Sequence, residues 1–116
     1  MIERKFMNRV VLSTGTIALV LLFSALSARA QETGDNLFKS KCAMCHGPDG
    51  AGKTKMGETL KIPDLQSADV QKKSDADLNA VIAKGRNKMP AYEAKLSKEE
   101  IAKLVVYIRE LAKKPT

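Results

Sequence analysis

The segment from Cys42 to His46 constrains this chain more than any other feature. It reads Cys-Ala-Met-Cys-His and holds both cysteines and the single histidine of the 116-residue sequence. Two thiols separated by two residues can each add to a vinyl group of one porphyrin, and the adjacent imidazole can then ligate the iron. This pattern is the signature of covalent haem attachment. The sequence therefore predicts a fold built around one haem that is bound by Cys42, Cys45 and His46.

Two other uses of a C-x-x-C pair fit the sequence less well. A redox disulfide of this spacing is typical of a βαβ context, and no segment here has the pattern of a strand. A zinc site takes four ligands from Cys and His, whereas this chain offers three, all within Cys42–His46. A haem-free C-x-x-C oxidoreductase stays open as an alternative function.

The first thirty residues have the pattern of a secretory signal peptide. Basic residues at positions 4, 5 and 9 precede an uncharged run over residues 10–28. Ala28-Arg29-Ala30 matches the small-x-small cleavage site, so we expect a mature domain over residues 31–116 in the periplasm. The alternative is an uncleaved anchor that faces the periplasm, although the polar stretch Ser13–Thr16 weakens residues 10–28 as a membrane span.

The mature domain is small and mildly basic. About 86 residues build only a marginal apolar core, so a buried porphyrin and its two covalent bonds would add stability of the kind small domains need. The full chain has a net charge of +7, and residues 1–30 carry four basic groups and Glu3, which leaves about +4 for the rest. Without aromatic residues among the lysines, this charge does not indicate nucleic-acid binding.

The mature chain is predicted to begin with a helix and to continue as a loop. The helix spans Gly34–Cys42 and starts near Thr33 or Asp35. Residues 47–63 are rich in glycine, which favours a loop. The side chains expected to face inward or along the haem are Leu37, Phe38 and Lys41.

Two further helices follow recognisable capping signals. Ser74–Asp77 resembles an N-terminal cap, and Gly85 is a natural C-cap for the same helix. Ser97–Glu100 is a complete capping box, and Pro115 is expected to close the helix that it starts. Apolar residues at helical spacing are Leu78, Val81 and Ile82 in the second helix, and Ile101, Leu104, Val105, Ile108 and Leu111 in the third. The predicted fold class is all-α.

A second histidine cannot supply the sixth iron ligand, because His46 is the single histidine, so the methionines are the candidates. Met44 lies inside the attachment segment and cannot reach the opposite face of the ring. Met56 and Met89 are both candidates from the sequence pattern. A methionine at either position could instead fill the apolar core. Pro90 favours an extended backbone at Met89, which would suit a ligand.

Residues 33–112 resemble the class I c-type cytochromes, which are small monohaem electron carriers of bacterial periplasms. The likeness rests on Cys42–Gly47, on Lys88-Met89-Pro90-Ala91 and on Leu104–Ile108. It implies a cytochrome c-like bundle of short helices around one covalently attached haem c. It also implies that Met89, in a Met-Pro pair before the last helix, is the distal iron ligand.

The resemblance implies two structural details as well. In that family the first and last helices cross, and a small and an aromatic residue on the first meet a leucine and an aromatic residue on the last. Gly34 and Phe38, and Leu104 and Tyr107, stand at those spacings. The carbonyl of Pro63 is expected to accept a hydrogen bond from His46, since Pro48 lies too close to that histidine.

The implied function is transfer of one electron at a time between redox proteins. With His46 and Met89 both on the iron, no small-molecule substrate is expected to bind, and the protein is not expected to be an enzyme. Partners are expected to present acidic faces to basic residues near the haem edge, and a membrane is involved only if the N-terminal segment is uncleaved. The basic residues in question are Lys53, Lys55, Lys61, Lys84, Arg86, Lys88 and Lys95.

Two other functions remain as alternatives to a diffusing carrier. A haem enzyme or a gas-binding sensor would use the same attachment with a labile sixth ligand. An electron-transfer subunit of a larger membrane or dehydrogenase complex would keep the axial ligation of a carrier.

Overall fold

All regular elements in the described part of the chain are helices. The computed structural model describes residues 32–114; the expected signal peptide and Pro115 lie outside this range. The helices are α2 (Gly34–Lys41), α3 (Ala43–His46), α4 (Lys55–Leu60), α5 (Ala68–Gln71), α6 (Asp75–Lys84) and α7 (Lys98–Leu111). One isolated bridge between Arg86 and Met89 is the single strand-like pairing within residues 32–114. None of the described helices is long and apolar enough to cross a membrane.

Side chains at the predicted caps start the three longest helices. The Thr33 hydroxyl accepts a hydrogen bond from the backbone of Asn36 at 3.3 Å and starts α2. Ser74 and Ser97 each form a reciprocal capping box, with Asp77 and Glu100 respectively. Such a cap contributes about 1 kcal/mol to helix stability, so these local signals fix where α2, α6 and α7 begin.

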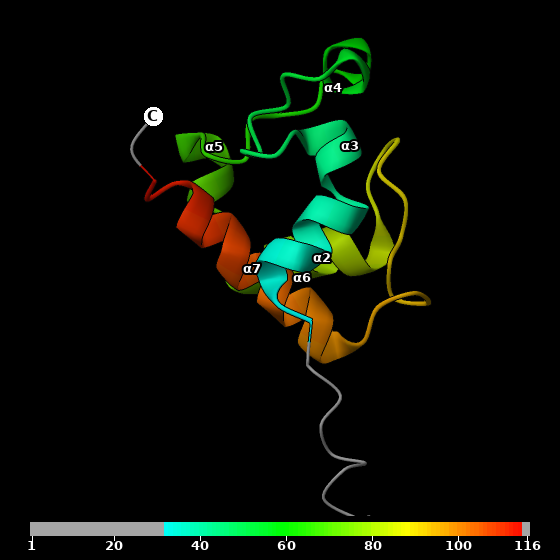
Figure 1. The fold of residues 1–116 in the computed structure, drawn as a ribbon. Helices are drawn as coiled ribbons and strands as arrows, with labels where there is room; N and C mark the ends of the chain where they lie inside the picture. The colour runs from blue at the N-terminus through cyan, green and yellow to red at the C-terminus, as the bar shows by residue number, and fades with distance from the viewer. Residues whose placement is uncertain (1–31, 115–116) are drawn as a thin grey trace, which may run out of the picture. The chain divides into compact units, whose positions relative to one another are not determined.

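The first and last of these helices cross at a glycine, as the sequence predicts. Figure 1 shows α2 lying against α7, and a Cβ built on Gly34 would lie 2.5 Å from the carbonyl oxygen of Lys103. The rings of Phe38 and Tyr107 are 5.2 Å apart beside this contact, and Leu104 is 1% exposed. The crossing therefore requires a residue without a side chain at position 34.

The core forms where α2, α6 and α7 pack together. Every residue of the predicted apolar stripe of α7 is buried. Leu65 and Leu96 join the core from loops, and Val70 joins it from α5. The full set of buried hydrophobic residues is Leu37, Phe38, Leu65, Val70, Leu78, Ile82, Leu96, Ile101, Leu104, Val105, Tyr107, Ile108 and Leu111.

Three short helices, α3, α4 and α5, were not predicted. Residues 47–63 are not a continuous loop, because they contain α4, and α5 follows shortly afterwards. The Thr54 hydroxyl makes α4 possible by accepting a hydrogen bond from Gly57 and donating one to the Cys45 carbonyl, both at 2.8 Å. Pattern reasoning missed α4 because Gly57 lowers helix propensity and six residues are too few to show a period. The first helix ends at Lys41 rather than Cys42.

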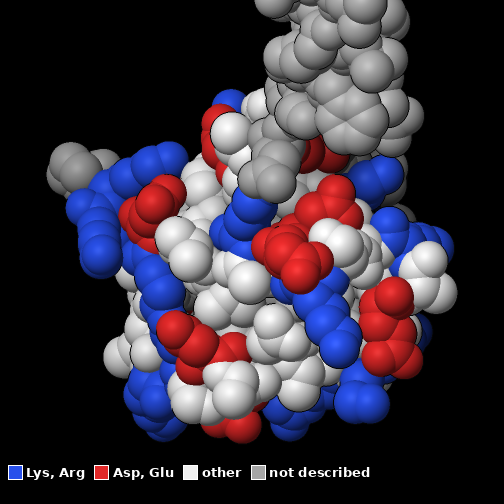
Figure 2. Space-filling model, turned by 90° about the horizontal axis from the view of Figure 1, so that it is seen from below, with Lys and Arg blue, Asp and Glu red and all other residues white. Residues whose placement is uncertain are grey.

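The outer surface carries charges of both signs. Figure 2 shows basic and acidic side chains interspersed over one face of the molecule. Exposed ion pairs in the described chain include Lys39 with Asp35 at 2.8 Å and Lys72 with Asp69 at 2.7 Å. Exposed pairs of this kind contribute little to stability.

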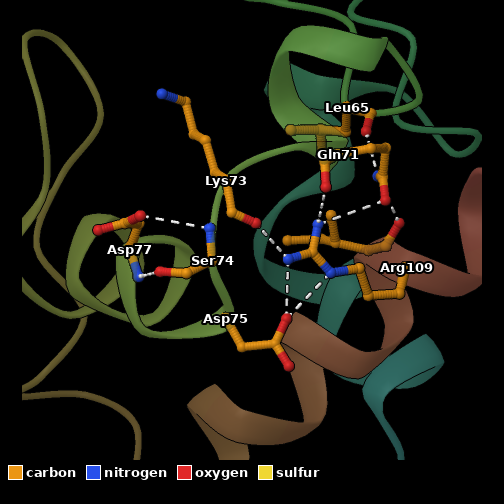
Figure 3. Close-up of polar contacts among 8 residues, drawn as sticks. Leu65, Gln71, Lys73, Ser74, Asp75, Asp77 and Arg109 are labelled. Atoms are coloured by element: carbon orange, nitrogen blue, oxygen red, sulfur yellow. Dashed lines mark hydrogen bonds and ion pairs between the residues drawn. The ribbon is translucent and has the colours of Figure 1, made fainter.

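A clasp of polar side chains fastens the segment 65–75 to α7. Arg109 donates hydrogen bonds to the carbonyls of Gln71 at 2.9 Å and Lys73 at 2.6 Å, and to the Asp75 carboxylate at 2.8 and 3.0 Å (Figure 3). The Gln71 amide in turn donates to the carbonyl of Leu65 at 2.7 Å, and to that of Ile108 in α7 at 3.2 Å. One arginine and one glutamine thus satisfy four backbone carbonyls, and three of these bonds join segments that are far apart in the sequence.

Candidate functional site

The two cysteines and the histidine lie on one helical turn. Cys42 separates α2 from α3, and its carbonyl accepts hydrogen bonds from the backbone of Cys45 at 3.1 Å and of His46 at 2.9 Å. All three residues are partly buried, and the two thiols are not joined in a disulfide. This turn presents two thiols and an imidazole from one short stretch of backbone.

His46 and Met89 share the walls of three adjoining pockets. One of these pockets also includes both cysteines, and the other two reach apolar side chains of the core such as Leu65, Leu78 and Val81. The first pocket is lined by Lys41, Cys42, Cys45, His46, Leu60, Lys61, Ile62, Pro63, Arg86, Lys88, Met89, Pro90 and Tyr92. The structure thus brings the predicted attachment residues and the predicted distal ligand to one apolar hollow.

Met89 reaches this hollow on a loop that folds back over the end of α6. Gly85 ends α6 with φ 74°, and a Cβ there would lie 2.6 Å from the Met89 carbonyl oxygen. Arg86 and Met89 exchange two backbone hydrogen bonds of 3.2 and 2.9 Å, which close a tight turn. A side chain at position 85 would obstruct this turn, so the glycine that ends the helix also allows Met89 to come close.

The other two methionines of the described chain lie outside these pockets. Met44 is 81% exposed and Met56 is 45% exposed, and neither lines a pocket that contains His46. Met89 is partly buried and packs against the core. Geometry therefore separates the two candidates that the sequence pattern left open, and it favours Met89.

Burial sets the protonation of the attachment residues. It lowers the pKa of His46, which favours the neutral imidazole, the form that binds a metal. Burial, followed by the proximity of Cys45, raises the pKa of the Cys42 thiol to about 11. The reactive cysteine of a C-x-x-C oxidoreductase has a lowered pKa instead, so this environment argues against the haem-free alternative.

Pro63 lies where a partner of His46 would lie, but the hydrogen bond is not formed. Pro63 lines two of the pockets that His46 also lines. The Nδ1 atom of His46 is buried and has no hydrogen-bond partner. The expected role of the Pro63 carbonyl therefore stays a prediction.

Four basic residues and no acidic residue line the first pocket. Lys61, Arg86 and Lys88 line it as expected, and Lys41 joins them. The remaining expected residues, Lys53, Lys55, Lys84 and Lys95, are exposed but line none of the three pockets. We call Lys41, Lys61, Arg86 and Lys88 the basic rim.

Sequence reasoning missed one contact at this mouth. The Tyr92 hydroxyl donates a hydrogen bond to the Lys41 carbonyl at 3.1 Å, across 51 positions of the sequence. Tyr92 also lines the first pocket together with Met89. In the sequence, Tyr92 is notable only because it lies three residues after Met89, and this spacing does not predict a hydrogen bond to Lys41.

The donor set fits a covalently attached haem. Two free thiols, one neutral imidazole and one thioether are the groups that attach a porphyrin and fill both axial positions of its iron. The Nδ1 of His46 is buried and unpaired, so an imidazole that ligates haem through its other nitrogen would still need an acceptor for Nδ1. Among the described residues, no group of three or more His, Cys, Asp or Glu side chains is placed to bind a metal ion.

Comparison with known proteins identifies the family. A family model described as cytochrome C oxidase, cbb3-type, subunit III matches residues 29–108. The chain belongs to this family of c-type cytochromes. A cytochrome c6-like protein of Nostoc is 30% identical over 102 residues, which is 84% of this chain and 89% of that protein.

Two further relatives point to the same family. The cbb3-type cytochrome c oxidase subunit FixPc of Rhizobium leguminosarum is 34% identical over 82 residues, 69% of this chain. This cytochrome spans 27% of the length of FixPc. The solved structure of the c-type cytochrome KustC0563 superposes with a TM-score of 0.64 and 33% identity, covering 69% of this chain and 98% of that one.

Several predictions of the sequence are thereby confirmed. The fold is the all-α cytochrome c fold, and the protein carries covalently bound haem c with its iron. It is an electron-transfer protein of the cytochrome c type, with redox proteins as partners.

Proposed function

We propose that this cytochrome is a periplasmic one-electron carrier with a single haem, attached through Cys42 and Cys45 and ligated by His46 and Met89. The observation that carries the proposal is the pocket that all four residues line. Of the methionines in residues 32–114, only Met89 lies in a wall shared with His46.

The surrounding residues suit fast and reversible electron transfer. Bound haem iron supplies the one-electron couple. The Met89 thioether favours the reduced state, and apolar residues such as Leu65 and Leu78 disfavour the extra charge of the oxidised state. With His46 and Met89 both bound to it, the iron would leave no place for a substrate or a gas, which supports a carrier over an enzyme or a sensor.

The Pro63 carbonyl is the proposed acceptor for Nδ1 of His46. A buried ring nitrogen that lacks a partner costs free energy, and Pro63 is close enough to line the same pockets. If the folded, haem-loaded protein shows no signal from the Nδ1 proton of His46, this hydrogen bond is contradicted.

Residues 1–30 are proposed to direct export and then to be removed. The cleavage pattern Ala28-Arg29-Ala30 supports this, and the preceding basic and uncharged segments have the matching order. The N-terminus of the exported protein, read by mass spectrometry, should be Gln31. A product that keeps residues 1–30 would support the anchored form.

The basic rim is proposed to dock against acidic faces of redox partners. Its four residues make no ion pair within residues 32–114, in contrast to Lys39 and Lys72 on the outer surface. Charges of one sign around the haem edge steer association and lose their effect as salt increases. Electron-transfer rates that do not change with ionic strength would contradict this docking mode.

An electron-transfer subunit of a larger oxidase complex is the second candidate. The family description and the 34% identity to FixPc favour it, while the cytochrome c6-like relative, matched over 89% of its length, favours a separate carrier. Native gel filtration of a membrane-free extract distinguishes the two, because a carrier elutes at the size of a single small domain.

Replacing Met89 with alanine tests the ligation directly. The oxidised M89A protein should lose the red charge-transfer band of methionine-ligated iron, bind carbon monoxide when reduced and show a lower midpoint potential. M56A is the matched control and should keep the band, because Met56 lies outside the pockets. A wild-type protein without haem would overturn the proposal, as would an M89A protein that retains the band.

A further inference from the structure

The loop that carries Met89 is attached to the two sides of the pocket in different ways. We call residues 85–96 the methionine loop. Towards α6 it is held by the backbone of Tyr92 and Glu93, whose N–H groups donate to the carbonyls of Ile82 and Ala83 at 3.0–3.1 Å. Towards the attachment turn, the Tyr92 hydroxyl bonded to Lys41 is the single hydrogen bond found in the described chain.

Tyr92 therefore joins the distal side of the site to the proximal side. Its backbone is fixed to α6, and its side chain ends on the residue that directly precedes Cys42. The ring lies in the pocket wall beside Met89, and the Lys95 ammonium lies 5.8 Å from the ring centre on the other side. Because the ring is held at both ends, the loop cannot move away from the attachment turn without breaking the hydroxyl bond.

The hydroxyl stays a donor over the physiological range. Burial raises the pKa of Tyr92, and the neighbouring Cys42 and Cys45 raise it further when their thiols are ionised. Once both sulfurs are thioethers they carry no charge, and burial alone remains. A single neutral hydrogen bond contributes about 0.5–1.5 kcal/mol net, which is enough to change the population of an open loop several-fold.

We propose that Tyr92 is a positioning residue, which keeps Met89 on the iron by fastening the methionine loop to the Lys41 carbonyl. This inference rests on the proposed ligation by Met89. The hydroxyl acts on the equilibrium between a closed loop and an open one, and only the open form leaves a coordination position for an outside ligand. Tyr92 itself touches no reacting atom.

Y92F tests the inference because it removes the hydroxyl and keeps the ring. The oxidised holoprotein should bind imidazole about fivefold faster than wild type and show a weaker charge-transfer band, since losing about 1 kcal/mol shifts an equilibrium by that factor. Y107F is the matched control. It removes the chain's other tyrosine hydroxyl, which interacts with Asp35 at the α2–α7 crossing, away from Met89.

The outcomes distinguish a failure of the positioning role of Tyr92 from a failure of iron ligation by Met89. A faster imidazole reaction in Y92F, with Y107F at the wild-type rate, supports the positioning role. Equal acceleration in both variants would show a general loss of stability and overturn it, as would a wild-type rate in Y92F. A wild-type protein that lacks the charge-transfer band would instead overturn the ligation by Met89, and the inference with it.

Discussion

The segment 65–75 and the methionine loop form walls of the same hollow, but they are fastened to the molecule in different ways. Several hydrogen bonds from the side chains of Arg109 and Gln71 connect the segment 65–75 to α7. The methionine loop depends on backbone bonds to α6 and on one tyrosine hydroxyl. The comparison leads us to expect that stability and the retention of Met89 on the iron depend on different residues.

The contacts made by Arg109 differ in their exposure to solvent. The Arg109 side chain is 24% exposed, and its contacts to the carbonyls of Gln71 and Lys73 are partly buried. Asp75 is 76% exposed, so the ion pair with Arg109 adds little. The carbonyl bonds of Arg109 therefore carry most of its contribution to stability.

The largest expected effect is that of R109A. Removing the guanidinium leaves carbonyls of Gln71 and Lys73 without a donor and should lower the free energy of unfolding by about 2–3 kcal/mol. Denaturant unfolding of the holoprotein measures the loss, and R109K should recover part of it. The charge-transfer band and the imidazole binding rate should stay at wild-type values, opposite to Y92F. If R109A also accelerates imidazole binding, the two walls are not independent.

A smaller effect is expected from Q71A. The variant loses the amide bonds to the carbonyls of Leu65 and Ile108 and should cost about 1 kcal/mol. The Gln71 and Arg109 side chains meet directly only through one long contact of 3.4 Å. Because Arg109 also donates to the Gln71 carbonyl, the two variants remove parts of one hydrogen-bond network, and their effects should couple by about 0.5 kcal/mol in the double variant. A coupling as large as either single effect would show that the clasp acts as one cooperative unit.

The smallest effect concerns the cap of α6, which precedes the methionine loop. Hydrogen bonds from Ser74 lower the pKa of Asp77 in the folded protein below 3.8. The capping carboxylate thus adds stability above that pH, and the contribution disappears as the pH falls through the folded pKa. Unfolding followed from about pH 5 to about pH 3 should be less pH-dependent in D77N than in wild type. Identical profiles would show that this exposed cap contributes nothing measurable.

The sequence was sufficient wherever the determinant is local. The caps at Thr33, Ser74 and Ser97 and the Cys42–His46 motif are read within a few residues, and each lies where expected. The α2–α7 crossing could also be foreseen, through the family resemblance.

What the sequence could not show depends on distant partners or on very short elements. The bond between Tyr92 and Lys41 spans 51 positions, and the clasp of Arg109 reaches back 34–38 positions. Neither has a periodic signature, because each needs only one polar side chain and an accessible carbonyl. Helix α4 depends on Thr54, whose second bond goes to Cys45, outside the helix itself.

The very different exposure of the three methionines in the described residues predicts a graded response to oxidants. Met44, between the two cysteines, is the most exposed, Met56 follows, and Met89 is sheltered in the hollow. Sulfoxide formation follows access to the sulfur, so peroxide should mark Met44 first and Met89 last. Met44 can be oxidised while the partly buried Met89 remains intact, so mild oxidation should leave the charge-transfer band and the midpoint potential unchanged.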